Sequence, residues 1–260
     1  MTYEELVKKV NEKSNHADFE SKNGIQLQEV NAWTYWQGIG VRNPKVVVVG
    51  QDWGSSKAAK NYFTAIDEMI DEGVEHHDNV CYFKYVPEVY PGGKTFDTDL
   101  NLAEGLKHLG LGYEDVMHKR YPDLFFTNLI PWYRKSNKSV GGFKTSWITK
   151  DEDVKEYFSN LIQILNPKIV ICLGRDTFVH ATRIMGVQSV LGNKSWNQYL
   201  NTQERPVEIP LDSGKSVYFF AMCHPGYWGV KNRNKDGKSF CDDWKNIGEW
   251  IKYKNCLGRF

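Results

Sequence analysis

The chain has 260 residues, of which 41% are hydrophobic and 25% are charged. This length and composition are enough for one large folded domain with a full hydrophobic core, and they exclude a disordered or fibrous chain. The formal net charge of +1 is not the basic excess of many nucleic-acid binders, so any basic surface must be local. Because no apolar run reaches membrane-spanning length, we expect a soluble cytoplasmic protein.

The chain opens with MTYEELVKKVNEK (residues 1–13), in which charged and apolar residues alternate as in a short amphipathic helix. We interpret residues 1–260 as a single domain. Residues 1–43 form an N-terminal helical extension of this domain, and residues 44–260 form its core. Residues 74–95 and 186–216 are expected to be irregular insertions.

Four short apolar runs, each bounded by helix- and strand-breaking residues, predict four strands. Each run is rich in β-branched or aromatic residues and is nearly continuous, as expected for strands that are covered on both faces. The runs are KVVVVG (45–50), DLFFTN (123–128), KIVICLG (168–174) and VYFFAM (217–222).

Helical patterns lie between and after these strands. They cover residues 98–111, 151–165, 176–186 and 239–253. The second pattern begins with acidic residues and repeats its apolar positions at helical spacing; these positions are Val154, Phe158, Leu161 and Leu165. Alternating strands and helices predict an α/β fold, which we expect to be a three-layer α/β/α sandwich with a central four-stranded parallel sheet.

Parallel strands end at the same edge of a sheet, and ligands of such sheets bind beyond that edge. The segments that follow the four predicted strands carry the polar residues of interest. They are Gly50 to Gly54, Asn128, Gly174-Arg175 and His224-Pro225-Gly226. The sequence therefore predicts one cleft to which an acid, an amide, a glycine turn and an imidazole contribute.

Three familiar kinds of site do not fit these residues. The spacing after Gly50 is wrong for a phosphate-binding P-loop, there is no GxGxxG dinucleotide motif, and Asp52 would repel a phosphate. Residues that are adjacent in sequence rarely face each other, so Cys223 and His224 do not form a nucleophile pair. We interpret Cys223 as a packed strand end. The five cysteines form no CxxC pair, which predicts neither a disulfide framework nor a thiolate metal site.

At the same loops the sequence resembles the uracil-DNA glycosylase superfamily. GQDWG (50–54) is similar to the family's GQDPY or GEAPG loop, and FFTNLIPW (125–132) places an Asn at the end of the second strand. ICLGRDTF (171–178) is similar to the glycine turn after the third strand, and CHPGYWG (223–229) to the His-Pro-Ser loop after the fourth. Residues 95–116 resemble the segment where the family places a base-stacking Phe before a helix, so the likeness spans residues 45–229.

The resemblance implies a DNA glycosylase that hydrolyses the N-glycosidic bond of uracil or a related deaminated base. In this chemistry a sugar with oxocarbenium character forms while the base leaves with negative charge. Asp52 would stabilise the sugar cation and position water, and His224 would donate to the departing base. These two residues are the predicted catalytic residues.

The resemblance also assigns residues to the substrate. Asn128 would bind the Watson–Crick edge of a flipped base, Phe96 would stack on it, and Gly50 and Gln51 would contact it through the loop backbone. The residues expected to contact DNA are Ser55, Ser56, Gly174, Arg175, Tyr227 and Lys231. The expected partner is single- or double-stranded DNA, and we expect a monomer that uses no cofactor and no metal.

The sequence departs from the family pattern at three positions, and two alternative functions stay open. Trp53 replaces a proline, Gly54 replaces the tyrosine that blocks the thymine methyl in the strictest uracil enzymes, and Gly226 replaces a serine that contacts phosphate. Tyr227 or Trp228 could instead insert into the base stack.

The alternative functions are a non-catalytic nucleic-acid or base-binding module on this fold, and a hydrolase of free nucleosides or nucleotides, which the near-neutral charge would suit.

Overall fold

The computed structural model describes residues 1–13, 43–51, 97–110, 124–131, 152–202, 206–235 and 237–254. Within these residues, strands form a five-stranded sheet in the order β2-β1-β3-β5-β4. The strands are β1 (Val46–Gly50), β2 (Leu124–Asn128), β3 (Ile169–Leu173), β4 (Val207–Pro210) and β5 (Ser216–Met222). The chain is therefore an α/β protein.

The four predicted strands are β1, β2, β3 and β5, and they are parallel to one another. The prediction of a purely four-stranded sheet was wrong, because β4 adds a fifth strand that pairs antiparallel with β5 at the sheet edge. β4 and helix α9 (Trp196–Asn201) both lie in residues 186–216, which had been predicted to be irregular. Of the four side chains of β4, Ile209 alone is fully buried, so this edge strand carries little apolar signal.

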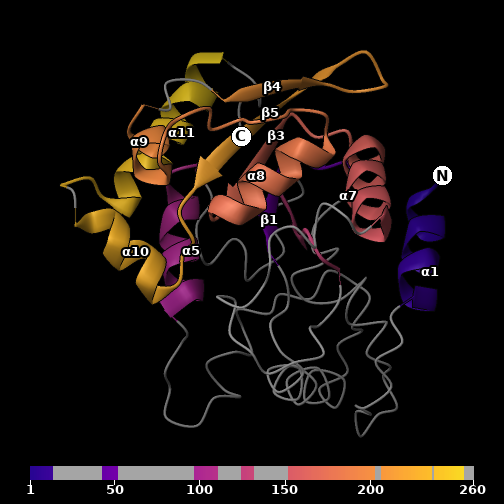
Figure 1. Cartoon of the computed structure of the whole chain (residues 1–260), viewed down its shortest axis with the longest axis horizontal. Coiled ribbons are helices and arrows are strands. Elements are labelled where there is room, and N and C mark those ends of the chain that lie inside the picture. Colours follow the sequence, from indigo (N-terminus) through magenta and orange to yellow (C-terminus); the bar gives the residue numbers. More distant parts are fainter. Residues whose placement is uncertain are drawn as a thin grey trace, which may run out of the picture.

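Helices of the described residues pack around the sheet (Figure 1). In Figure 1, α8 (Arg175–Ile184) crosses in front of the strands and α7 (Glu152–Leu165) lies beside it, with α1 (Tyr3–Lys13) beyond α7 near the N-terminus. Lys9 of α1 forms an ion pair with Glu156 of α7 at 2.7 Å. The helices besides α9 are α1 (Tyr3–Lys13), α5 (Asp97–Lys107), α7 (Glu152–Leu165), α8 (Arg175–Ile184), α10 (Tyr227–Asn234) and α11 (Phe240–Lys254).

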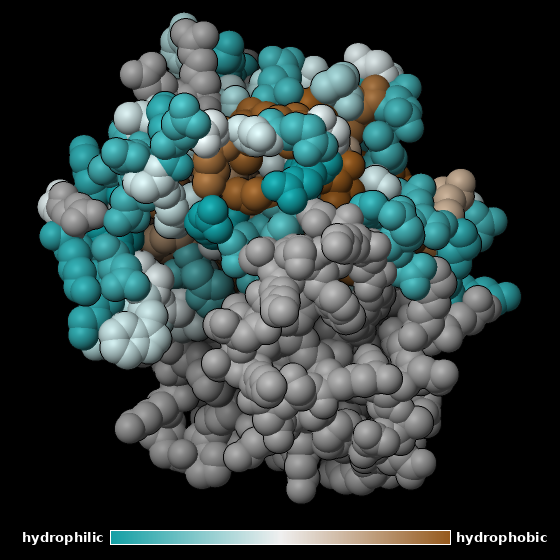
Figure 2. Space-filling model, in the orientation of Figure 1, coloured by the Kyte–Doolittle hydropathy of each residue, from teal (hydrophilic) through white to brown (hydrophobic). Residues whose placement is uncertain are grey.

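The core consists of the strands and the inner faces of these helices. Every side chain of β2 and β3 is buried, which explains why these runs are apolar without alternation. The four apolar positions predicted for α7 are also buried. On the described surface in Figure 2, apolar residues gather where α8 crosses the sheet, and hydrophilic residues surround them. None of the described helices combines the length and apolar character that a membrane crossing requires.

Helix α11 is fixed to the sheet and in turn supports α5. The Trp250 ring of α11 packs edge-on against Phe220 of β5, with ring centroids 5.2 Å apart. Gly105 of α5 lies so close to α11 that a Cβ at this position would overlap the indole of Trp244, which is fully buried. Glycine at position 105 therefore sets the distance between α5 and α11.

Replacing Gly105 with alanine tests this close approach. In an exposed helix the change would stabilise the protein by about 1 kcal/mol, but here we expect Gly105→Ala to lower the free energy of unfolding by about 1–3 kcal/mol, because buried Trp244 must shift. Urea denaturation measures the difference. Glu104→Ala, on the exposed side of the same helix, is the control and should change stability by less than about 0.5 kcal/mol. A Gly105→Ala protein as stable as the wild type would show that α5 is not held this closely.

Candidate functional site

The ends of β1 and β2 meet at one edge of the sheet. Gly50 lies opposite Asn128 in the parallel register, and the Leu129 N–H donates to the Gly50 carbonyl oxygen at 2.8 Å. The Asn128 side chain is only 8% exposed, and a Cβ at Gly50 would overlap its Oδ1 atom. The missing side chain at position 50 therefore allows the Asn128 amide to lie across the end of β1.

The ends of β3 and β5 meet at the same edge. The Gly174 N–H donates to the Met222 carbonyl oxygen at 2.7 Å, and Gly174 has a φ of 99°, which favours glycine. A Cβ at Gly174 would lie 3.7 Å from Cβ of His224. The glycine turn after β3 and the histidine loop after β5 are therefore direct neighbours.

The structure thus brings five of the predicted site residues to one edge of the sheet, since β1 pairs with both β2 and β3. They are Gly50, Gln51, Asn128, Gly174 and His224. The predictions for Asp52, Ser55, Ser56 and Phe96, and the departures at Trp53 and Gly54, lie outside the described residues.

The His224 ring is held in one tautomer by its own loop. The Gly226 backbone N–H donates to Nδ1 of His224 at 2.9 Å, so Nδ1 carries the lone pair and the ring proton of a neutral imidazole is on Nε2. The side chain is exposed. His224 can therefore present an N–H donor at the edge of the sheet.

Gly226 is required by the packing of this loop. A Cβ at position 226 would lie 2.9 Å from Nδ1 of His224 and 3.2 Å from the Thr98 hydroxyl of α5. The Asn101 side-chain amide of α5 also donates to the Pro225 carbonyl oxygen at 2.8 Å. The departure from serine at position 226 thus accompanies a tight contact between the loop and α5.

Helix α10, which follows the histidine loop, is anchored by a buried ion pair. Nε and Nη2 of Arg233 donate to the two carboxylate oxygens of Asp243 in α11, both at 2.6 Å, and Nη1 donates to the Asn201 side chain of α9 at 2.7 Å. Arg233 lies in a run rich in basic residues, yet it is only 3% exposed and is paired.

The first two turns of α10 carry an exposed group of two aromatic rings and a cation. Tyr227 is 51% exposed and Trp228 is 66% exposed, and their ring centroids are 5.1 Å apart in an edge-to-face arrangement. Nζ of Lys231 lies 5.2 Å and 5.1 Å from the two ring centroids. We call these three residues the aromatic–lysine cluster. Large exposed aromatic rings of this kind are typical of binding surfaces.

The N-terminus of α8 lies at the same edge as the histidine loop. Its N-cap is Gly174, which supplies no capping side chain, so the N–H groups of the first turn point away from the helix without an intrahelical partner. The hydroxyl of Thr177 is buried, close to Gly174, and has no hydrogen-bond partner among the described residues. Arg175 is exposed and pairs with the adjacent Asp176 at 3.1 Å.

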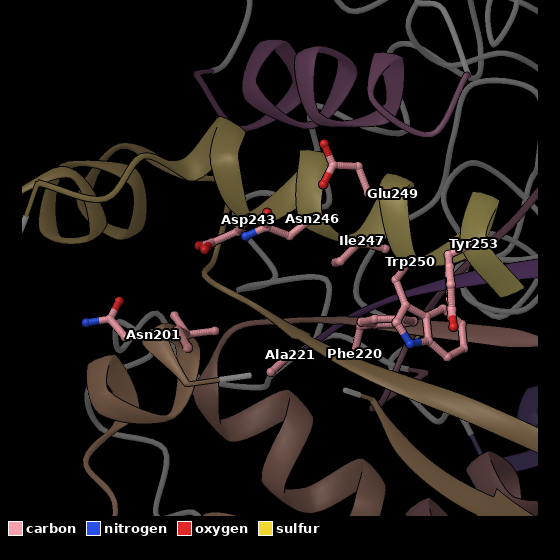
Figure 3. A pocket seen from close by; sticks show the side chains of 10 residues that line it. Asn201, Phe220, Ala221, Asp243, Asn246, Ile247, Glu249, Trp250 and Tyr253 are labelled. Carbon is pink, nitrogen blue, oxygen red and sulfur yellow. The ribbon is translucent and has the colours of Figure 1, made fainter. Parts of the chain in front are cut away.

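A cavity of about 510 Å³ lies elsewhere, between α9, β5 and α11 (Figure 3). In Figure 3 the rings of Phe220, Trp250 and Tyr253 gather at one end, and Asn201 and Asp243 lie at the other. Both of these polar residues are bound by Arg233. The polar end of the cavity therefore serves to anchor α10, and none of the predicted site residues lines it.

Several of these contacts carry no sequence signal. Asn101 is a polar residue in an ordinary amphipathic helix, and Arg233 lies in a segment rich in exposed charges. Their partners, Pro225 and Asp243, are 124 and 10 positions away in the chain. Pairing of this kind depends on how the helices pack, so the sequence pattern could not have identified it.

Among the described residues, no group of three or more His, Cys, Asp or Glu side chains could hold a metal ion.

Known proteins do not identify the site. No protein-family model matches the chain, and no curated protein matches it.

The buried ion pair leads to a stability prediction. Arg233→Met leaves the Asp243 carboxylate buried without its counter-charge, so we expect the free energy of unfolding to fall by about 3–5 kcal/mol. Urea denaturation measures the loss. Arg175→Met removes an exposed pair and should cost less than about 1 kcal/mol. Equal effects of the two substitutions would show that the Arg233 pair does not anchor α10.

A labelling experiment tests whether Cys223 is a packed strand end. Burial raises the pKa of the Cys223 thiol to about 12, with a further contribution from Asp243, so its thiolate fraction at pH 8 is about a thousandfold below that of an ordinary cysteine. We expect iodoacetamide to label Cys223 far more slowly in the folded protein than in urea, with the rate rising only as the pH approaches 12. Peptide mass spectrometry measures the labelling. Rapid labelling at pH 8 would indicate an accessible, reactive thiol.

Proposed function

We propose that the chain is a DNA glycosylase that hydrolyses the N-glycosidic bond of uracil or a related deaminated base. The observation that carries this proposal is the position of two complementary polar groups at one edge of the sheet. The Asn128 amide lies at the end of β2, and the exposed His224 imidazole, with its proton on Nε2, follows β5. The α/β/α layering and the DNA partner implied by the family resemblance belong to the same proposal, as does a reaction without metal or cofactor.

The spacing of the strands supports a ligand between these two side chains. β2 and β5 are separated by β1 and β3, so their axes are about 14 Å apart at ~4.8 Å per strand spacing. In the proposal, the base lies between the Asn128 and His224 side chains within this distance. The Asn128 amide, with both a donor and an acceptor, can bind the Watson–Crick edge of uracil, on which carbonyl and N–H groups alternate.

The tautomer of His224 suits the departure of the base. When the glycosidic bond breaks, its electron pair goes to the base, and negative charge develops on the carbonyl oxygens. A donor already directed at that oxygen stabilises the transition state without reorganisation. His224 supplies such a donor through Nε2–H, while the Gly226 N–H on Nδ1 holds the ring in place.

We assign the stabilisation of the positive charge that develops on the sugar to Asp52. In the proposal this carboxylate stabilises the sugar cation and orients the water that attacks the anomeric carbon. The preceding residue, Gln51, accepts a hydrogen bond from the Ile130 N–H at 3.0 Å. Gln51 therefore lies next to the residues that follow Asn128. Phe96, proposed to stack on the base, is the residue before α5 in the sequence.

Two described features support contacts to DNA. The N–H groups at the N-terminus of α8 that have no intrahelical partner, together with Gly174 and Arg175, form a surface suited to a backbone phosphate. The aromatic–lysine cluster presents exposed rings on the helix that follows the His224 loop, and in the proposal Tyr227 or Trp228 stacks on bases next to the flipped nucleotide. Ser55 and Ser56 complete the proposed set of DNA contacts.

The proposal predicts that base release depends on Asp52 and His224. On an oligonucleotide with one uracil, the single-turnover rate of base release should fall by about 100-fold or more in both Asp52→Asn and His224→Gln, because each variant loses a group that acts in the transition state. Scission of the abasic product on a gel measures the rate. Asp212→Asn is the control and should behave as the wild type. Asp212 lies in the turn between β4 and β5, at the end of the sheet where the parallel strands begin.

The same assay separates the alternatives. Salt-dependent DNA binding by the wild type without base release would favour a binding module. Release of the base from a free nucleoside but not from DNA would favour a nucleoside hydrolase. Equal rates for wild type and Asp52→Asn would contradict the catalytic assignment.

A further inference from the structure

We propose that Asn101 is a positioning residue that orients the His224 ring through a single peptide group. This inference rests on the proposed function for its effect on catalysis. Asn101 lies in α5, and its side-chain amide donates to the Pro225 carbonyl oxygen at 2.8 Å. Nothing in the resemblance or in the helix pattern assigns a role to this residue.

Asn101 and His224 bind the two ends of one peptide unit. The Pro225 carbonyl and the Gly226 N–H belong to the same planar peptide group, in which the C=O and N–H bonds point in opposite directions. Asn101 binds the oxygen of this group, and Nδ1 of His224 binds its hydrogen at 2.9 Å. Asn101 therefore fixes the direction in which the Gly226 N–H points.

The two hydrogen bonds also strengthen each other. A donor on the carbonyl oxygen polarises the peptide group and makes its N–H a better donor, as in other hydrogen-bond chains. A stronger bond to Nδ1 keeps the lone pair there and the ring proton on Nε2. The chain of contacts thus runs from the Asn101 amide through one peptide group to the nitrogen that faces the substrate.

Helix α5 is a firm support for this contact. Gly105 and Gly248 allow α5 and α11 to approach so closely that a Cβ at either position would overlap the other segment. Pro225 is buried, and the Thr98 hydroxyl of α5 lies against Gly226. Because the loop is held between these groups, the peptide group cannot turn while Asn101 binds its oxygen.

Two substitutions at Asn101 test the proposal. Asn101→Asp keeps the shape of the side chain but replaces the donor with a carboxylate that repels the Pro225 carbonyl, and Asn101→Ala removes the side chain. We expect both to lower the single-turnover rate of base release by about tenfold or more, with little change in the KM for the uracil oligonucleotide. Asn101→Gln keeps the donor and should recover part of the rate.

Nitrogen-15 NMR of the protein labelled at histidine measures the tautomer of His224 independently of activity. In the wild type, Nδ1 of His224 should show the signal of an unprotonated ring nitrogen and Nε2 that of an N–H. In Asn101→Asp and Asn101→Ala we expect a mixture of tautomers. Asn160→Asp is the matched control, because its amide donates to a carbonyl oxygen within α7 at 2.7 Å; it should change neither the rate nor the His224 signals.

The outcomes keep this inference apart from the proposed function. If the wild type releases no base, the proposed function fails, and the NMR comparison alone decides whether Asn101 sets the tautomer. If the Asn101 variants lose stability in urea but keep the wild-type His224 signals and rate, Asn101 is merely structural and the inference is overturned. An unchanged tautomer in Asn101→Asp would overturn it equally.

Discussion

The candidate site depends on the parallel register of the central strands. Gly50 is paired with Asn128, and Leu173 with Met222. The paired strands therefore end at the same level, and the polar residues at or just after their ends lie at one edge of the sheet. A slip of one residue in β2 would turn Asn128 to the other face of the sheet. Glycine at position 50 is part of the same constraint, since any side chain there would occupy the space of the Asn128 amide.

The register brings the groups together, but helices outside the sheet decide how the histidine loop is held. α10 is tied to α9 and α11 through Arg233, and α5 binds the loop through Asn101, with the Thr98 hydroxyl close to Gly226. α11 is in turn packed on β5 through Trp250. An exposed imidazole can therefore keep a defined orientation, because the backbone on both sides of it is bound to buried structure.

The sequence predicted the parts of the structure that follow from apolar periodicity. Runs of buried side chains identified β1, β2, β3 and β5, and helical spacing identified the buried face of α7. It missed β4, whose exposed side chains resemble those of a loop, and α10, whose buried side chain is an arginine. Breaker residues at strand ends indicated where His224 and Asn128 would meet the sheet edge. The contact between Asn101 and Pro225 depends on helix packing across 124 positions, which no local pattern contains.

The distribution of charge bears on how such a chain would hold DNA. With a net charge of +1, the molecule as a whole attracts a polyanion weakly, and phosphate contacts must come from a few local groups. In the proposed function, the exposed rings of the aromatic–lysine cluster are a second source of affinity, because bases stack on aromatic side chains. Lys231 lies over the two rings, with its Nζ atom 5.2 Å and 5.1 Å from their centroids. In the proposed function, a chain of low net charge with exposed rings in the helix after the His224 loop would favour a locally unstacked strand, whose bases are open to stacking, over an intact duplex.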